Sequence, residues 1–146
     1  MTMNNILIID DNIAILEALA TVVGTQLNNC NIITAHNGEE GIATINSMPL
    51  TLILTDLNMP VVDGYGVIAH RNKSCPRVPL YVMSGDLYPE VRERLCELSV
   101  SGCIEKPFPF EQIMEIIEYE LNVGSIDTVK NERPRMQPAA HSLMCA

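Results

Sequence analysis

The sequence predicts an α/β fold in which a mostly parallel, five-stranded sheet carries helices on both faces. Short apolar runs rich in β-branched residues alternate five times with longer segments whose apolar residues recur at helical spacing. Each repeat spans roughly 20 to 25 residues, which suits a strand followed by a helix. Right-handed crossovers place the carboxyl ends of parallel strands at one edge of the sheet. Sheets of this kind bind ligands at that edge.

The first part of the chain predicts two strand–helix pairs. Residues 6–9 (ILII) are apolar throughout, as in a strand buried on both faces. Residues 13–27 carry apolar side chains one helical turn apart and predict a helix. Residues 32–33 indicate a weaker second strand, and residues 38–48 follow an Asn-Gly turn as a second helix.

The middle of the chain begins with another buried strand at residues 51–55 (TLILT). Residues 58–66 start as a loop because they contain Pro60 and two glycines. A short helix over residues 65–72 follows, and residues 79–83 (PLYVM) predict the fourth strand.

The last repeat opens with a helix over residues 89–98, since a proline suits the first helical turn. Residues 100–104 predict a short fifth strand, and apolar residues at helical spacing over residues 110–121 predict a final helix that Gly124 ends. Residues 125–146 lack any periodicity. We therefore expect one folded domain over residues 1–124 and a flexible polar tail over residues 125–146.

Length, charge and composition exclude several classes of function. With 146 residues, the chain suits one compact domain. A net charge of −9 would repel a phosphate backbone, so we expect no direct binding to nucleic acid. No apolar run approaches the ~20 residues of a membrane span. Five cysteines without C-x-x-C spacing indicate no zinc site, and we expect a cytoplasmic location.

Polar side chains follow four of the five predicted strands and should meet at one edge of the sheet. They are Asp10, Asp11, Asp56, Ser84 and Lys106. Clustered carboxylates offer the hard oxygen ligands that Mg²⁺ prefers. A lysine beside them can offset charge and pair with an incoming anion, and a hydroxyl can hydrogen-bond to that anion. These are the groups needed to transfer a phosphoryl group onto a carboxylate.

The chain resembles the receiver domain of two-component response regulators over residues 5 to about 121. The order and spacing of the motifs carry this resemblance. They are Asp10-Asp11, Asp56-Leu57-Asn58-Met59-Pro60 with Asp63-Gly64, Ser84-Gly85, and Lys106-Pro107-Phe108. The resemblance implies the flavodoxin-like sheet of strand order 2-1-3-4-5.

The resemblance also implies a role for each matching residue. Asp56 would be the phosphoacceptor, and Mg²⁺ (or Mn²⁺) would be held by Asp11, by Asp56 and by the backbone carbonyl of Asn58. Asp10 would act on the metal through water.

The other two residues would bind the phosphoryl group itself. Lys106 would bind its oxygens, and Ser84 would turn inward to hydrogen-bond to it.

One position departs from the family pattern. Cys103 stands three positions before the lysine, where the family usually has an aromatic side chain that swings between two rotamers. A thiol is too small for that lever, so coupling to the surface should be weaker or use other residues. We expect that surface to comprise residues of the fourth helix, fifth strand and fifth helix. They are Arg92, Glu93, Cys103, Glu105, Gln112 and Glu115.

The expected function is a phosphorylation-dependent switch that catalyses only its own phosphorylation and dephosphorylation. Its partners would be a sensor histidine kinase or histidine phosphotransfer protein and a downstream protein target, and the surface just described could also form a homodimer. A receiver-like scaffold that binds partners without phosphorylation is the alternative. A haloacid-dehalogenase-like phosphatase is disfavoured because it needs D-x-D after the first strand, where this chain has adjacent acids.

Blander roles remain open for single residues. Asp10 or Asp11 could cap the first helix, Ser84 could belong to an ordinary turn, and Lys106 could be a surface lysine. Cys103 could be a small buried core residue or a redox-sensing thiol.

Overall fold

The computed structural model describes residues 3–123, in which strands and helices alternate five times. The strands are β1 (Asn4–Ile9), β2 (Cys30–Ala35), β3 (Leu52–Asp56), β4 (Leu80–Ser84) and β5 (Gly102–Glu105). The helices are α1 (Ile13–Gln26), α2 (Gly38–Ser47), α3 (Gly64–Ser74), α4 (Pro89–Glu97) and α5 (Phe110–Val123). The strands pair in parallel in the order β2-β1-β3-β4-β5, which confirms the predicted fold class. The predicted polar tail, residues 125–146, lies outside the described residues.

The first two strands are longer than the apolar pattern predicted. β2 covers Cys30–Ala35 rather than residues 32–33, because it pairs with β1 from Asn4↔Cys30 to Ile9↔Ala35. It lies at the edge of the sheet, and all but one of its six residues are half-buried or exposed, so polar residues are tolerated there. The other boundaries lie within two residues of those predicted.

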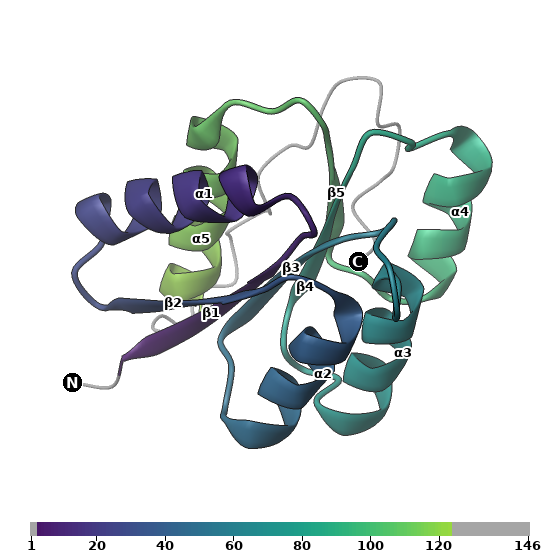
Figure 1. Ribbon diagram of the computed structural model, residues 1–146, viewed down its shortest axis with the longest axis horizontal. Coiled ribbons are helices and arrows are strands. Elements are labelled where there is room, and N and C mark those ends of the chain that lie inside the picture. Colours follow the sequence, from purple (N-terminus) through teal and green to yellow (C-terminus); the bar gives the residue numbers. More distant parts are fainter. Residues whose placement is uncertain (1–2, 124–146) are drawn as a thin grey trace.

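Helices cover both faces of the sheet, with α1 and α5 on one side and α2, α3 and α4 on the other (Figure 1). The sheet has a hydrophobic core on each face, and alternate residues of β1 pack into one or the other. Ile6 and Ile8 pack with α1 and α5, whereas Leu7 and Ile9 pack on the opposite side. All four are fully buried, which explains the uninterrupted apolar run. None of the helices in residues 3–123 combines the length and apolar character that a membrane span requires.

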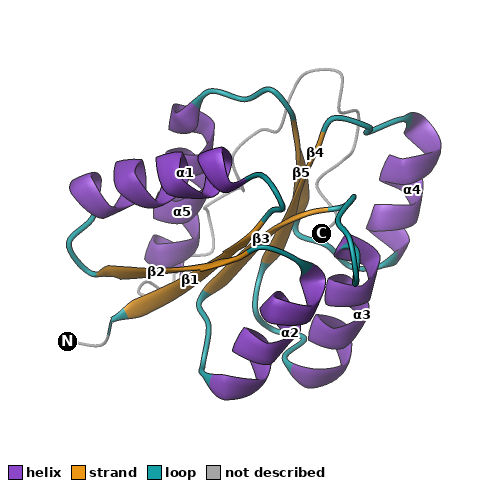
Figure 2. Cartoon of the chain, in the orientation of Figure 1, coloured by secondary structure: helices purple, strands orange, loops and turns teal. Residues whose placement is uncertain are grey.

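The loops at the carboxyl ends of the strands lead directly into helices with well-defined starts (Figure 2). The Asn12 side chain accepts a hydrogen bond from the amide of Ile15 at the start of α1. The Asp63 side chain accepts one from the amide of Gly66 at the start of α3. Such caps contribute about 1 kcal/mol each and fix where these two loops end.

Candidate functional site

Three carboxylates meet at the carboxyl edge of the sheet. Asp10 and Asp11 follow β1 directly, and Asp56 ends the adjacent strand β3. One carboxylate oxygen from each lies within 4.8 Å of those from the other two. Asp10 is fully buried, Asp56 is 7% exposed, and Asp11 is exposed. The cluster is therefore accessible to water from the Asp11 side.

A lysine that follows β5 offsets part of this negative charge. The Nζ atom of Lys106 lies 2.6 Å from Oδ2 of Asp10 and 3.3 Å from Oδ2 of Asp56. The backbone amide of Lys106 donates to the carbonyl of Ser84 at 2.9 Å, so the segment after β5 is held beside the end of β4. The peptide bond between Lys106 and Pro107 is cis.

Burial and charge shift two pKa values in this cluster. Burial raises the pKa of the Asp56 carboxyl above its ordinary value, and the Asp10 carboxylate adds to the rise, while Lys106 opposes it. Burial by itself would lower the pKa of Lys106, but its hydrogen bond to Asp10 and the charges of both carboxylates raise it overall. Lys106 is therefore a cation at neutral pH, and Asp56 loses its proton less readily than an ordinary aspartic acid.

The backbone next to Asp56 fixes the direction of its carboxylate. Oδ1 accepts a hydrogen bond from the amide of Leu57 at 2.8 Å, while Oδ2 faces Lys106. Gly64 closes the following loop, because its amide donates to the carbonyl of Leu57 at 2.8 Å. A Cβ atom at Gly64 would lie 2.3 Å from the carbonyl oxygen of Asp56, so this close approach requires glycine.

A polar contact that the sequence pattern did not reveal joins the loops after β3 and β4. Ser84 is buried, and its Oγ accepts a hydrogen bond from the amide of Asp86 at 3.1 Å. The Asp86 carboxylate in turn accepts one from Nδ2 of Asn58 at 3.2 Å. Asp86 follows Ser-Gly, a sequence typical of turns, so no motif marked it as part of the site.

The structure decides between roles that the sequence left open. Asn12 is the N-cap of α1, so neither Asp10 nor Asp11 serves that purpose. Asp10 instead accepts from the amide of Asn12 through Oδ1, at 2.9 Å, and pairs with Lys106 through Oδ2. A lysine that bridges two carboxylates is likewise no ordinary surface side chain.

Two residues expected to belong to the surface of α4, β5 and α5 are buried. Cys103 is 2% exposed and packs in the core under α4, and Arg92 is 8% exposed. The surface role fails for both residues because α4 covers this face of β5, whereas the alternative of a small buried core residue at Cys103 is confirmed. Burial raises the pKa of the Cys103 thiol to about 11, against a smaller opposing effect of Arg92. Such a thiol stays protonated and inert at neutral pH.

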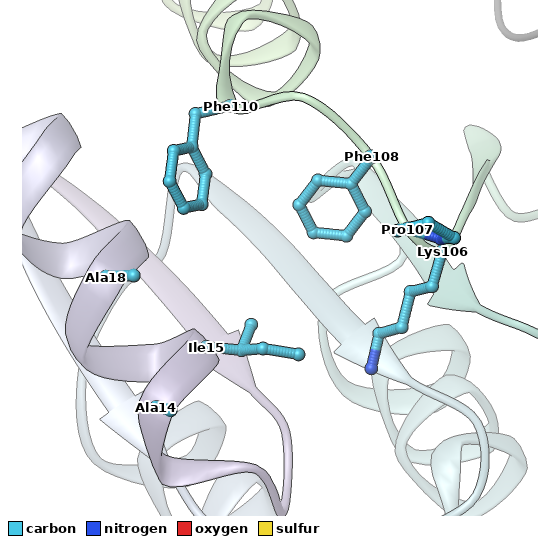
Figure 3. A pocket seen from close by; sticks show the side chains of 7 residues that line it. All are labelled: Ala14, Ile15, Ala18, Lys106, Pro107, Phe108 and Phe110. Carbon is cyan, nitrogen blue, oxygen red and sulfur yellow. The ribbon is translucent and has the colours of Figure 1, made fainter.

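An apolar hollow of about 460 Å³ lies beside the charged cluster, between α1 and the segment from β5 to α5 (Figure 3). Apolar side chains of α1 lie on one side of it and those of the segment from β5 to α5 on the other, with Lys106 beside them. The residues that line it are Ala14, Ile15, Ala18, Lys106, Pro107, Phe108 and Phe110.

The donor set fits a hard divalent cation. Asp10, Asp11 and Asp56 offer carboxylate oxygens only, which suits Mg²⁺ or Mn²⁺ better than zinc. Mg²⁺ is usually held by one or two carboxylates and keeps several waters, and the exposed Asp11 side leaves access for them. The residues present therefore fit the cation that the receiver resemblance implies.

Comparison with known proteins identifies relatives of this chain. Residues 6–118 match the family model of the response regulator receiver domain. The chain is 27% identical to a probable chemotaxis protein CheY from Rhizobium etli, covering 77% of this chain and 88% of that protein. It is 32% identical to the positive alginate biosynthesis regulatory protein from Pseudomonas aeruginosa, covering 78% of this chain and 46% of that protein. The chain thus spans less than half of the second relative.

Solved structures agree on the fold. A CheY-like receiver domain protein from Methanospirillum hungatei has a TM-score of 0.79 and 22% identity, over 85% of this chain and 98% of that one. The chemotaxis response regulator CheY4 of Vibrio cholerae has a TM-score of 0.73 and 22% identity, over 82% and 99%. Because the family model covers most of the chain, this protein belongs to the response regulator receiver domains, the signalling domains of two-component and phosphorelay systems.

Proposed function

We propose that this chain is a phosphorylation-dependent signalling switch whose phosphoacceptor is Asp56. One observation carries the proposal: the ammonium of Lys106 bridges Asp10 and Asp56 beside the exposed carboxylate of Asp11. A nucleophilic carboxylate, a cation and further oxygen ligands within a few ångströms are the groups that phosphoryl transfer to aspartate requires.

The donor would be a phosphohistidine of a sensor histidine kinase or of a histidine phosphotransfer protein. A carboxylate oxygen of Asp56 attacks the phosphorus, and the bond from phosphorus to the histidine nitrogen breaks. The imidazole keeps the electron pair and takes a proton from water, and an aspartyl phosphate remains. Because the transferred group is highly charged and loosely bound in the transition state, the chain contributes mainly positioning and charge compensation. It would turn over no external metabolite.

A bound Mg²⁺ or Mn²⁺ would neutralise negative charge on the phosphoryl oxygens. Asp11, Asp56 and the backbone carbonyl of Asn58 would hold this cation. Asp10 would act through a water molecule, and its two occupied oxygens, one on the Asn12 amide and one on Lys106, support that indirect role.

Ser84 would report the arrival of the phosphoryl group. Its hydroxyl oxygen accepts from the amide of Asp86, which fixes the start of the loop after β4. A hydrogen bond from Ser84 to a phosphoryl oxygen would change the best position of this loop, and the charge added at Asp56 supplies the driving force.

The output would pass through contacts with a downstream protein. The surface formed by α4, β5 and α5 carries the exposed Glu93 and Glu115 and the half-buried Glu105, so it suits a partner with basic groups. A homodimer through this surface would bring like charges together, and sedimentation with and without a phosphoryl mimic tests that second arrangement.

The expected absence of nucleic-acid binding and the cytoplasmic location remain predictions.

Acetyl phosphate with Mg²⁺ and intact-protein mass spectrometry test the proposal. The wild type should gain one phosphoryl mass, and Asp56→Asn should gain none. Asp63→Asn is the matched control, because asparagine keeps the helix cap in the same loop. A folded wild type that binds Mg²⁺ without gaining mass would contradict the switch and favour the scaffold.

A further inference from the structure

A buried arginine links the loop that carries Ser84 to β5. Arg92 lies in α4 and is 8% exposed. A guanidinium stays charged in proteins and is rarely this buried unless its donors are paired. Its partners therefore indicate why it is there.

Arg92 contacts two elements other than its own helix. Its Nε donates to the backbone carbonyl of Leu87 at 2.7 Å, in a buried hydrogen bond. Leu87 lies between β4 and α4, three residues after Ser84, and its own side chain is buried. The Nη2 atom of Arg92 lies 3.6 Å from Oε2 of Glu105, the last residue of β5 and the neighbour of Lys106. A single guanidinium thus holds the loop after β4 and the end of β5 together.

Arg92, and not Cys103, makes the side-chain link between α4 and β5. Cys103 and Glu105 are two residues apart in β5, so their side chains leave the strand on the same face. The guanidinium of Arg92 pairs with Glu105 on this face, and its charge partly offsets the effect of burial on the pKa of the Cys103 thiol. Cys103 is too short to reach across to α4 as a lever, whereas Arg92 spans that distance in the opposite direction.

We propose that Arg92 is a positioning residue that passes the state of the loop after β4 to the end of β5. The proposal rests on the proposed function, because a phosphoryl group on Asp56 must first draw Ser84 inward. The Leu87 carbonyl then moves with the loop. A buried carbonyl without a donor is unfavourable, and the rigid guanidinium fork cannot follow it while keeping its distance to Glu105. Arg92 therefore shifts with the loop, and Glu105 at the surface is released.

Three variants separate this role from a general effect of charge on α4. Arg92→Gln removes the charge, and Arg92→Lys keeps the charge but loses the fork that serves two partners. Arg94→Gln is the matched control, since Arg94 lies on the same helix but stacks 3.9 Å from the centroid of the Tyr65 ring. It makes the same change in net charge without touching the Leu87 carbonyl or Glu105.

Backbone amide spectra with and without beryllofluoride and Mg²⁺ provide the readout. In the wild type, amides next to Asp56 and those of Glu105 and Gln112 should both shift. In Arg92→Gln and Arg92→Lys, beryllofluoride should still bind within about threefold of wild type, and the amides next to Asp56 should still shift. The shift at Glu105 and Gln112 should fall to about half or less. Arg94→Gln should respond as the wild type does.

The outcomes distinguish failure of the Arg92 proposal from failure of the proposed phosphorylation switch. A wild-type-sized response at Glu105 in both Arg92 variants, or an equal loss in Arg94→Gln, overturns the role of Arg92 and leaves the switch standing. A wild type with no shift next to Asp56 overturns the proposed function and this inference together. If Arg92→Gln does not fold, Arg92→Lys decides, and failure of both to fold would show that Arg92 is only structural.

Discussion

Replacing Lys106 with methionine should lower the free energy of unfolding by about 3 to 4 kcal/mol at pH 7 without divalent cations. Methionine keeps much of the apolar stem and removes the charge. Asp10 is fully buried, and the ammonium 2.6 Å away is its charged partner. Removal of one member of a buried ion pair costs roughly 3–5 kcal/mol, because the other charge remains buried without compensation.

Protonation sets an upper limit to this loss. The carboxylate left without its partner can take up a proton, which costs 1.36 kcal/mol for each unit of pH above the ordinary aspartic acid value of about 3.9. The limit is therefore about 4 kcal/mol at pH 7 and about 1.5 kcal/mol at pH 5. The loss should shrink as the pH falls, because the folded variant then binds a proton that the unfolded chain does not.

The difference in unfolding free energy between the wild type and the Lys106 variant should also shrink at alkaline pH. The pKa of Lys106 is raised in the folded state by Asp10 and Asp56, which outweigh the effect of burial. Its stabilising effect is thus fully present below the ordinary lysine value of 10.5 and is lost as the pH rises through the higher folded-state value.

Urea denaturation at pH 5 and pH 7 measures the effect. Lys73→Met is the control, because Lys73 is exposed in the last turn of α3, and it should cost less than about 1 kcal/mol. Mg²⁺ should restore part of the loss in the Lys106 variant, since the cation compensates the same carboxylates. A loss below about 1 kcal/mol at pH 7, or an equal loss at both pH values, would refute the account of a stranded buried charge.

Three further expectations follow. Val61 is β-branched and 73% exposed, and its φ of 70° strains the backbone. Val61→Asn should therefore raise the unfolding free energy, measured in urea, by about 1 kcal/mol. An unchanged value would contradict the strain. Asp11→Asn should weaken Mg²⁺ binding by about tenfold or more in a titration while the fold is retained, and unchanged affinity would remove Asp11 from the ligand set. The buried thiol of Cys103 should react with iodoacetamide at neutral pH more slowly than the half-buried Cys30 and Cys75, and equal rates by peptide mapping would argue against its burial.

The fold could be predicted from the sequence because the central strands are buried on both faces. Ile6, Leu7, Ile8 and Ile9 all have zero exposure, so the apolar run is continuous and its length gives the strand. The edge strand β2 was underestimated because its stability comes from pairing with β1, and a pairing leaves no apolar pattern in the sequence.

The grouping of polar side chains at the carboxyl edge of the sheet was predictable for a related reason. Parallel strands bring their carboxyl ends together, so polar residues directly after strands, such as Asp10, Asp56 and Lys106, must converge. Asp86 and Arg92 could not be found in this way. Asp86 acts through the geometry of a turn, and Arg92 lies within a helix whose register alone decides whether its side chain is buried.

Lys106 is shared between two carboxylates, and this sharing predicts how Asp56 responds to the loss of Asp10. Burial raises the pKa of Asp56, the Asp10 charge raises it further, and Lys106 lowers it. Asp10→Asn removes the repulsion and leaves the ammonium to Asp56 alone, so the pKa of Asp56 should fall relative to wild type. A carbon-detected NMR titration of the Asp56 carboxyl in both proteins measures the change, with Asp63→Asn as the control. An unchanged or higher pKa in Asp10→Asn would mean that Asp10 and Asp56 do not repel each other. A lower pKa would show that Asp10 raises the pKa of Asp56 in the wild type, by its own charge and by its share of the Lys106 ammonium.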